Sequence, residues 1–447
     1  MRVLIVLALC GACAFAKPVP TAVTDLAVDG DVTTAHVGAM QVIVRKTPGK
    51  AQASIHLYIK GGARNWTAED AGVEALGLAV AVRGGAHGID ADELQNRLSA
   101  AGASLSGGAG AQYSTIASTT LLPGFDVAFD AVAQAFLDPI LPELYFDVFK
   151  RGFGGNLEEE DASPRGSESK LTTLMMMRNT PFANRPNGEI TTIAHLQFAD
   201  VARHLAKIRE ASRLVLVVVG DVDPAKILEQ TRTTYAGLKD GDYKDEPIKG
   251  PHYDSPGLAT KVAKLANGAP LPTNFVFAGF SGPGWHDPDV GAATVAMHLL
   301  QEREFEEVRT KRNLSYAPGA GFSANANFGV SNLSVSAVDV NTTMKVMFDT
   351  AKSLRDVPVE QKDLDATKAV FATSFLMQGD TTDGQASMLG TFQIVAGDWR
   401  LSRTLPGKLG SVTASDVAAF AKKYFANPQM VVVGDPTKVD PRVLKEL

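Results

Sequence analysis

The sequence predicts an α+β protein of two homologous domains, each an antiparallel sheet with helices packed on one face. The first observation is a repeat: residues 200–221 read DVARHLAKIREASRLVLVVVGD, and residues 416–435 read DVAAFAKKYFANPQMVVVGD. The Asp-Val-Ala triplets begin 216 residues apart and the Gly-Asp pairs 214 apart. The second observation is that strand-like runs cluster early and late in each copy, with helical runs between them. This order favours an α+β layer over alternating βαβ units.

Each element of the first copy follows from its local pattern. Apolar, partly alternating runs predict strands at 42–46 and 54–62, and a stretch of small residues at 105–119 predicts a hairpin. Helical periodicity predicts the other elements of this copy, at 72–82, 127–136, 167–178 and 198–208.

The second copy repeats the early part of this order. An extended run at 274–284 ends in glycine, and a helical run at 290–300 follows it. The glycines that end the extended runs lie 222 residues apart, and those that open the helices, Gly72 and Gly291, lie 219 apart. Offsets that stay close to one value indicate two diverged copies with short insertions.

Composition patterns predict the divisions of the chain. Residues 1–16 combine an early Arg2, an apolar run and a small-x-small end at 14–16, which is typical of a cleaved export signal. We therefore expect an exported protein, periplasmic or secreted. A charged, Gly/Pro-rich stretch predicts a linker at 241–254. The two domains are then expected at 24–240 and 255–447.

The overall charge and cysteine content exclude several classes of protein. The net charge is −6, and no basic block is long enough to follow a phosphate backbone, so we expect no nucleic-acid partner. No later apolar run is long enough to span a membrane. Both cysteines, Cys10 and Cys13, lie inside the predicted signal, so the mature chain has no disulfide and no cysteine metal ligand. A lipid anchor on either cysteine remains an alternative.

Two segments carry a resemblance to a known family. They are WTAEDAGVEALGLAVAVRGGA at 66–86 and REFEEVRTKRNLSYAPGAGFS at 303–323. Together with the two-copy layout, they make the chain similar to the pitrilysin/insulinase family of zinc peptidases, in its processing-peptidase-like branch. The resemblance covers nearly the whole mature chain and implies two homologous α+β domains that act on peptides.

In that family the helix after the glycine carries His-x-x-Glu-His. Two histidines four residues apart share a helical face and bind zinc, and the glutamate between them takes a proton from the bound water. Matching Gly72 to the family's glycine puts Ala75 and Ala79 at the histidine positions and Leu78 at the general base. These three side chains can neither bind a metal nor move a proton, so the resemblance is to an inactive subunit.

The family's remaining zinc ligand, a downstream glutamate, has no certain counterpart. The region 154–164 offers Asn156, Glu158 or Glu159 for its place, and the sequence does not choose among them. The run 158–161 is more simply a solvated group of charges before a helix. No two of the eight histidines lie within four residues of each other, so no shifted register restores the motif. We expect no cofactor in this chain, and zinc in an active partner subunit.

The second segment keeps what the resemblance implies for the other half of the site. In the family the second domain supplies an arginine and, seven residues later, a tyrosine, which here are Arg309 and Tyr316. An arginine can hold a carbonyl or carboxylate through two donors, and a tyrosine hydroxyl can donate to a developing oxyanion. The alternative is an exposed helix residue and a half-buried strand residue.

The glycine-rich segment 103–114 lies where active relatives have an edge strand that pairs with substrate. An exposed edge offers backbone donors and acceptors to an extended peptide. The same composition also suits a plain turn, and both readings stay open.

These observations lead to one main expectation and two alternatives. The chain is expected to be a catalytically silent subunit that forms a heterodimer with an active homologue and contributes Arg309 and Tyr316 to peptide binding. The first alternative is a scaffold or peptide-binding protein of the same fold, which includes self-association. The second is an active metallopeptidase with an atypical site.

Overall fold

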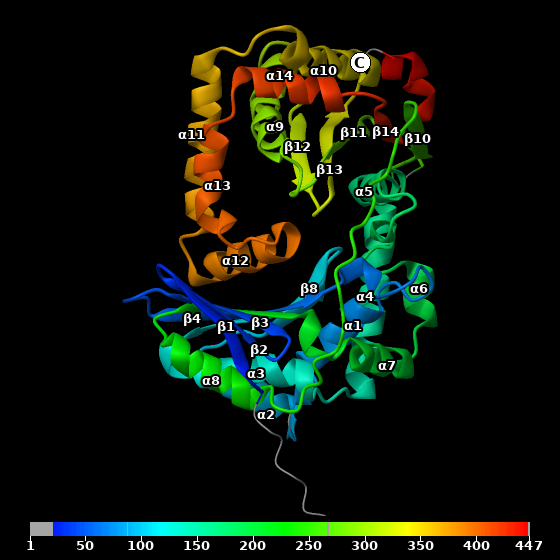
Figure 1. Ribbon diagram of the computed structural model, residues 1–447. Coiled ribbons are helices and arrows are strands. Elements are labelled where there is room, and N and C mark those ends of the chain that lie inside the picture. Colours follow the sequence, from blue (N-terminus) through cyan, green and yellow to red (C-terminus); the bar gives the residue numbers. More distant parts are fainter. Residues whose placement is uncertain (1–20, 87, 266–267, 446–447) are drawn as a thin grey trace, which may run out of the picture.

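The computed structural model describes residues 21–86, 88–265 and 268–445. The predicted export signal and its two cysteines lie outside these residues. Figure 1 shows two sheet-and-helix layers, one above the other, with the N-terminal half below and the C-terminal half above. Among the described residues, no helix is long and apolar enough to cross a membrane.

The first half is built on a seven-stranded sheet in the order β1-β2-β3-β9-β4-β8-β7. The valine run of the repeat forms β9, which pairs parallel to β3 and antiparallel to β4. All of β9 is buried, which explains why its sequence is continuously apolar instead of alternating. The strands are β1 (Val23–Asp29), β2 (Val32–Val37), β3 (Met40–Lys46), β4 (Gln52–Lys60), β7 (Ser106–Ala109), β8 (Tyr113–Leu121) and β9 (Leu214–Gly220).

The second half is built on a five-stranded sheet in the order β10-β14-β11-β13-β12. The second valine run forms β14, again parallel to one neighbour, β10, and antiparallel to the other, β11. The predicted α+β class is confirmed, but each sheet contains one parallel pair and is therefore mixed. The strands are β10 (Gly257–Val262), β11 (Asn274–Pro283), β12 (Gly319–Ala324), β13 (Phe328–Ala337) and β14 (Gln429–Gly434).

Fourteen α-helices lie in the described residues, and each predicted helical run coincides with one of them to within two residues at its ends, or lies inside it. A π-helical turn, η5 (Phe305–Thr310), follows α9 directly. The first half has α1 (Val73–Ala81), α2 (Ala91–Ala100), α3 (Phe125–Leu137), α4 (Glu143–Ala162), α5 (Pro164–Met176), α6 (Ile190–His195), α7 (Phe198–Ile208) and α8 (Pro224–Thr234). The second half has α9 (Val290–Glu304), α10 (Val340–Asp356), α11 (Gln361–Gln378), α12 (Thr382–Ala396), α13 (Leu401–Gly410) and α14 (Ala414–Tyr424).

The repeated Asp-Val-Ala triplet has the same structural task in both halves. Asp200 and Asp416 are each the third residue of their helix and accept a hydrogen bond from the backbone N–H at the helix start, at 2.8 Å in both cases. This is the capping-box arrangement, which supplies an acceptor to one of the unpaired N–H groups at a helix start. The valine of each triplet is buried in the core of its own half.

One helix of each half crosses over to cover the open face of the other half's sheet. α12 packs on β4 and β9 of the first sheet, where Ala386, Leu389 and Trp399 join a core of strand residues. In return, α5 packs on β11 and β14 of the second sheet. α5 begins at residue 164 and α12 at 382, an offset of 218, so these are corresponding helices of the repeat. The exchange joins the two halves into one body.

Candidate functional site

α1 is the helix that the resemblance matches to the family's zinc helix. Gly72 caps it with a left-handed φ of 96°, and a Cβ there would lie 2.5 Å from Ile193, so this position requires glycine. Ala75 and Leu78 are buried, at 3% and 1% exposure, and Ala79 is partly buried. These side chains fill the helix face with hydrocarbon and offer no atom to a metal.

The edge strand β7 lies directly on this helix. A Cβ at Gly107 would lie 2.8 Å from Val82 and 3.5 Å from the Cβ of Leu78, so only glycine permits this approach. The 103–114 segment therefore contains a true edge strand, hydrogen-bonded only to β8.

The three candidates for the last zinc ligand do not face α1. Asn156, Glu158 and Glu159 are all exposed on α4, whereas Leu157 is buried in the core that α1 and α4 share. Residues 158–161 precede a helix, α5, and Glu158 and Glu159 are exposed, as the charge-run interpretation expects; the run is itself helical, because it forms the last part of α4. The set of residues in this region therefore does not fit a zinc ion.

The sequence analysis missed a polar cluster on the same helix, around Glu74. This carboxylate is fully buried and accepts hydrogen bonds from Asn65 Nδ2 at 3.0 Å, from His204 Nε2 at 2.7 Å and from the Ser114 hydroxyl. These partners come from the segment before α1, from α7 and from β8. The signal was present: Glu74 is the single charge in the apolar run 72–82, and a buried carboxylate needs partners.

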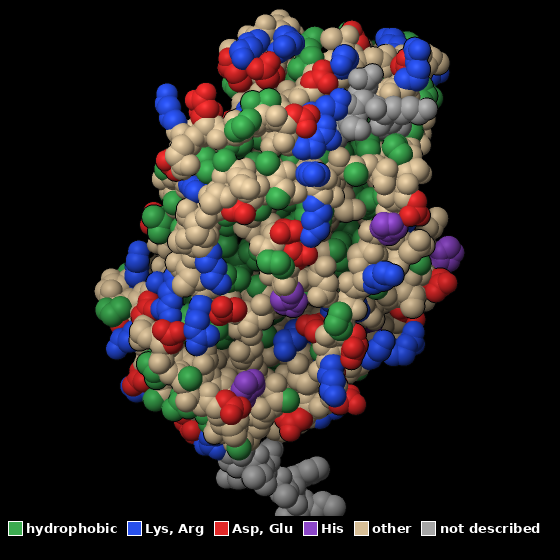
Figure 2. Space-filling view, turned by 45° about the horizontal axis from the view of Figure 1, so that its top comes forward, with side chains coloured by type: hydrophobic (Ala, Val, Ile, Leu, Met, Phe, Trp, Pro, Cys, Tyr) green, Lys and Arg blue, Asp and Glu red, His purple; other side chains and the backbone are tan. Residues whose placement is uncertain are grey.

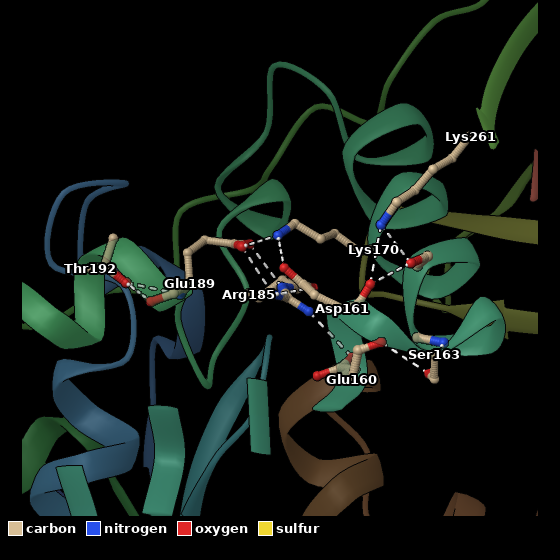
Figure 3. A network of polar contacts seen from close by, with 10 residues as sticks. Glu160, Asp161, Ser163, Lys170, Arg185, Glu189, Thr192 and Lys261 are labelled. Atoms are coloured by element: carbon tan, nitrogen blue, oxygen red, sulfur yellow. Dashed lines mark hydrogen bonds and ion pairs between the residues drawn. The ribbon is translucent and has the colours of Figure 1, made fainter. Parts of the chain in front are cut away.

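A second polar network surrounds the end of α4 (Figure 3). Lys170 lies 2.6 Å from both Asp161 and Glu189, and Arg185 Nε lies 2.8 Å from Glu189. Burial alone would lower the pKa of Lys170, but the hydrogen bonds to the two carboxylates outweigh it and raise that pKa. Lys261 of the second half donates to the backbone carbonyl of Asp161 at 3.1 Å. Asp161 thus helps join the two halves through its backbone carbonyl, while Glu158 and Glu159 of the same run are exposed.

The histidines of the described residues do not assemble into a metal site. Among the described residues, no group of three or more His, Cys, Asp or Glu side chains could hold a metal ion. His204 is tied to Glu74, and His195 Nδ1 lies 2.6 Å from the Thr191 carbonyl oxygen. His87 lies outside the described residues.

Arg309 and Tyr316 lie together at the end of α9. The Arg309 guanidinium carbon lies 4.0 Å from the centre of the Tyr316 ring and 4.8 Å from that of Phe305, which places it between two aromatic faces. Tyr316 is 78% exposed, so the half-buried alternative for this side chain is wrong. Within the described part of the chain, no carboxylate forms an ion pair with Arg309. The structure therefore brings together the two residues that the sequence singled out and leaves both available.

The face of the molecule drawn in Figure 2 is mixed in charge. Figure 2 shows basic and acidic side chains interspersed over the face in view, without a large block of either sign.

Comparisons with known proteins agree with this geometry. Residues 195–371 match the family model described as "Peptidase M16 inactive domain". The chain is 20% identical over 410 residues to an uncharacterized zinc protease of Streptomyces coelicolor, covering 89% of this chain and 88% of that one. It is 21% identical over 266 residues to the non-peptidase homolog YmxG of Helicobacter pylori, covering 57% of this chain and 60% of that one.

Two further likenesses are partial or concern the fold alone. Subunit 1 of the bovine mitochondrial cytochrome b-c1 complex is 24% identical over 196 residues, which span 42% of this chain but only 38% of that subunit. The crystal structure of a peptidase M16 inactive domain from Pseudomonas fluorescens superposes with a TM-score of 0.81 at 19% identity, covering 90% of this chain and 97% of that one.

The fold and the altered helix define a class: a two-domain peptidase-like protein whose zinc helix has no ligands. These matches support an inactive-type homologue of the pitrilysin family, also called peptidase M16, which is the family that the sequence resembles. The same matches indicate that it is not catalytic on its own.

Proposed function

We propose that this chain is the silent subunit of an exported heteromeric zinc peptidase. Its partner is a homologue with an intact His-x-x-Glu-His helix, which holds the zinc. This chain contributes Arg309 and Tyr316, which reach across a shared chamber to the peptide at the partner's metal. The partner, the substrate and the compartment all belong to the proposal.

One observation carries the proposal. The residues matched to the family's zinc ligands are replaced in the first half, whereas the arginine and tyrosine of the second half are kept. Alanine and leucine fill the zinc positions on α1, while Arg309 and Tyr316 remain stacked, unpaired and accessible. A side chain as large as tyrosine at 78% exposure has little role in stabilising this chain alone. A stacked arginine is also partly fixed in position, which lowers the entropy that binding must offset.

The test is peptide turnover by the mixed pair. We expect no cleavage by this chain alone and restored cleavage when it is mixed with an active homologue from the same source. Tyr316→Phe and Arg309→Ala should each lower turnover about 100-fold, the usual loss when one oxyanion donor is removed. Arg312→Ala is the matched control, because Arg312 is an exposed arginine three residues away, paired with Glu307.

Unchanged turnover in both variants, with the complex intact, would remove the proposed role of Arg309 and Tyr316. Cleavage by this chain alone, with stoichiometric metal, would instead favour the atypical peptidase.

A non-catalytic scaffold is the second candidate, and the partial match to a respiratory-complex subunit favours it. A scaffold should form a stable assembly from which any zinc peptidase is absent. Affinity purification from the native source, followed by mass spectrometry of the captured proteins, separates the two functions.

A further inference from the structure

The second half contains a pocket on the helix that corresponds to α1. α9 opens at Gly291 as α1 opens at Gly72, so Thr294 and His298 lie where Ala75 and Ala79 lie in the first half. In the first half the edge strand β7 closes this face. In the second half the corresponding face of α9 borders a cavity of about 440 Å³.

The lining of the cavity, which opens to solvent, suits an apolar ligand. Protein interiors have few voids larger than a water molecule, whereas ligand pockets measure about 300–1,000 Å³. Much of the wall is aromatic, and its rings hold one another in place: Trp285 meets Phe392 edge-on at 5.2 Å, and Phe371 stacks on Phe375 at 5.7 Å. The aromatic lining residues are Trp285, Phe322, Phe371, Phe375 and Phe392.

One wall of the cavity is the edge strand β12. It is the last strand of its sheet and pairs only with β13; Figure 1 shows it opposite α11 and α13. Its alternate residues Ala320, Phe322 and Ala324 line the cavity. An edge strand next to a pocket allows a peptide to pair with the backbone and place a side chain in the pocket.

A side-chain amide already pairs with this edge. Gln301 Oε1 accepts a hydrogen bond from the Ala320 N–H at 2.7 Å, and its Nε2 donates to the Pro318 carbonyl at 3.2 Å. The amide of Gln301 therefore takes the place of one peptide unit of a neighbouring strand. Because hydrogen bonding alternates along an antiparallel strand, Phe322 and Ala324 direct their backbone groups outward as Ala320 does.

Among the described residues that line the cavity, His298 is the one titratable side chain, and it is uncharged at neutral pH. The His298 ring lies edge-on to that of Phe371, with ring centres 5.3 Å apart. The side chain keeps contact with solvent, and its partial burial lowers its pKa below the usual 6.5. The cavity wall thus presents aromatic carbon, a neutral imidazole and the amides of Gln301 and Gln378, without a free charge.

We propose that this cavity binds a large apolar side chain, aromatic or branched, of an extended peptide whose backbone pairs with β12 beyond Gln301. The free backbone edge favours a peptide over an isolated small molecule. This site belongs to the second half alone and does not depend on Arg309, Tyr316 or a zinc-bearing partner.

The proposal is tested by fluorescence anisotropy on the chain alone. The probe is a short, labelled Thr/Ser-rich peptide with one central Phe. We expect replacement of that Phe by Ala to weaken binding about 10- to 100-fold, the value of burying one aromatic side chain. N-methylation of the probe's edge-facing amides should weaken binding, and N-methylation of the alternate amides should not.

Thr294→Trp should fill the cavity and abolish binding. Thr373→Trp is the matched control: Thr373 lies exposed on α11, and both hydroxyls donate to the carbonyl four residues earlier. Far-UV circular dichroism of both variants shows whether each is folded.

Three outcomes would overturn the proposal: equal affinity for the Phe and Ala probes, undiminished binding by a folded Thr294→Trp, or competition by free N-acetyl-phenylalanine amide as strong as that of the peptide. Because the anisotropy experiment contains no partner subunit, a negative result would not bear on the proposed pairing. In the same way, a failure to form the pair would not bear on peptide binding at this pocket.

Discussion

At the residue scale, the clearest anomaly is the buried carboxyl of Glu304, the last residue of α9. It has no exposed surface, and neither oxygen has a hydrogen-bond partner in the described part of the chain. Burial, followed by the charge of Glu307, raises its pKa well above the usual value of 4.5. The residue therefore costs stability and lies directly before the η5 turn that carries Arg309.

We expect Glu304→Leu to raise the free energy of unfolding by about 1–3 kcal/mol at neutral pH, the usual cost of an unsatisfied buried polar group. A carboxyl whose pKa rises on folding holds its proton longer when folded, so it destabilises more as pH rises above 4.5. The gain should therefore shrink below that pH. Urea unfolding at several pH values measures this gain in the free energy of unfolding, and Glu306→Leu, at an exposed position, is the control. A gain that does not change with pH would contradict this account.

Glu74 presents the opposite case, a buried carboxylate with three donors. We expect Glu74→Ala to lower the free energy of unfolding by about 3 kcal/mol, because it leaves those donors buried and unpaired. Exposed Glu143→Ala should change it by less than about 0.5 kcal/mol. If Glu74→Ala proves as mild as the control in chemical denaturation, the cluster does not hold α1 in place.

At the element scale, the crossed helices α5 and α12 decide whether the halves move as one body. α12 touches the first sheet through its small residues: a Cβ at Gly390 would lie 2.1 Å from the ring of Tyr58, which is buried. The hydroxyl of Tyr58 donates to the Ala386 carbonyl at 3.2 Å and keeps the ring in place. Where α5 packs on the second sheet, Gly279 of β11 faces the flexible side chain of Met176 of α5, and a Cβ at Gly279 would lie 2.5 Å from its sulfur.

We therefore expect Gly390→Val to displace α12 and loosen the two halves, since the ring cannot give way. Gly279→Ala should be milder, because a thioether side chain adapts to its surroundings. Gly407→Ala, in a helix with open space around it, is the neutral control. Small-angle scattering and limited proteolysis report on the separation; wild-type behaviour of folded Gly390→Val would show that α12 does not join the halves.

The same contact predicts a pH dependence. Asp383 of α12 lies 2.9 Å from His56 of β4, and this hydrogen bond holds the pKa of the carboxyl below its usual 3.8. A lowered carboxyl pKa stabilises the folded state above pH 3.8, and this stabilisation is lost as pH falls further. We expect the free energy of unfolding of Asp383→Asn to fall less steeply than that of the wild type as the pH drops below 3.8. If the two fall equally, other groups cause the acid sensitivity.

At the scale of the whole molecule, the duplication made most of the fold predictable. The repeated helix and valine run identified corresponding elements of both halves, and periodicity located α1, α3, α5, α7 and α9 but not most of the other helices. The parallel pairing of β3 with β9 was not predictable, because it joins segments about 170 residues apart whose contact leaves no local pattern. The crossing of α5 and α12 is equally non-local.

The site was predictable in part for a similar reason. Motif spacing singled out Ala75, Leu78, Ala79, Arg309 and Tyr316. It did not show that Leu157, which lies between polar residues of α4, is buried against the core that includes α1. The pocket on α9 left no motif, because its aromatic wall comes from β12 and from helices far along the chain.

We propose that this chain pairs with a zinc-bearing homologue and brings no metal of its own. Native mass spectrometry of the purified chain, of the homologue and of their mixture tests it most directly. We predict a metal-free chain alone and, after mixing, a one-to-one complex that holds a single zinc. A chain that retains stoichiometric zinc by itself, or a mixture in which no complex forms, would contradict the account.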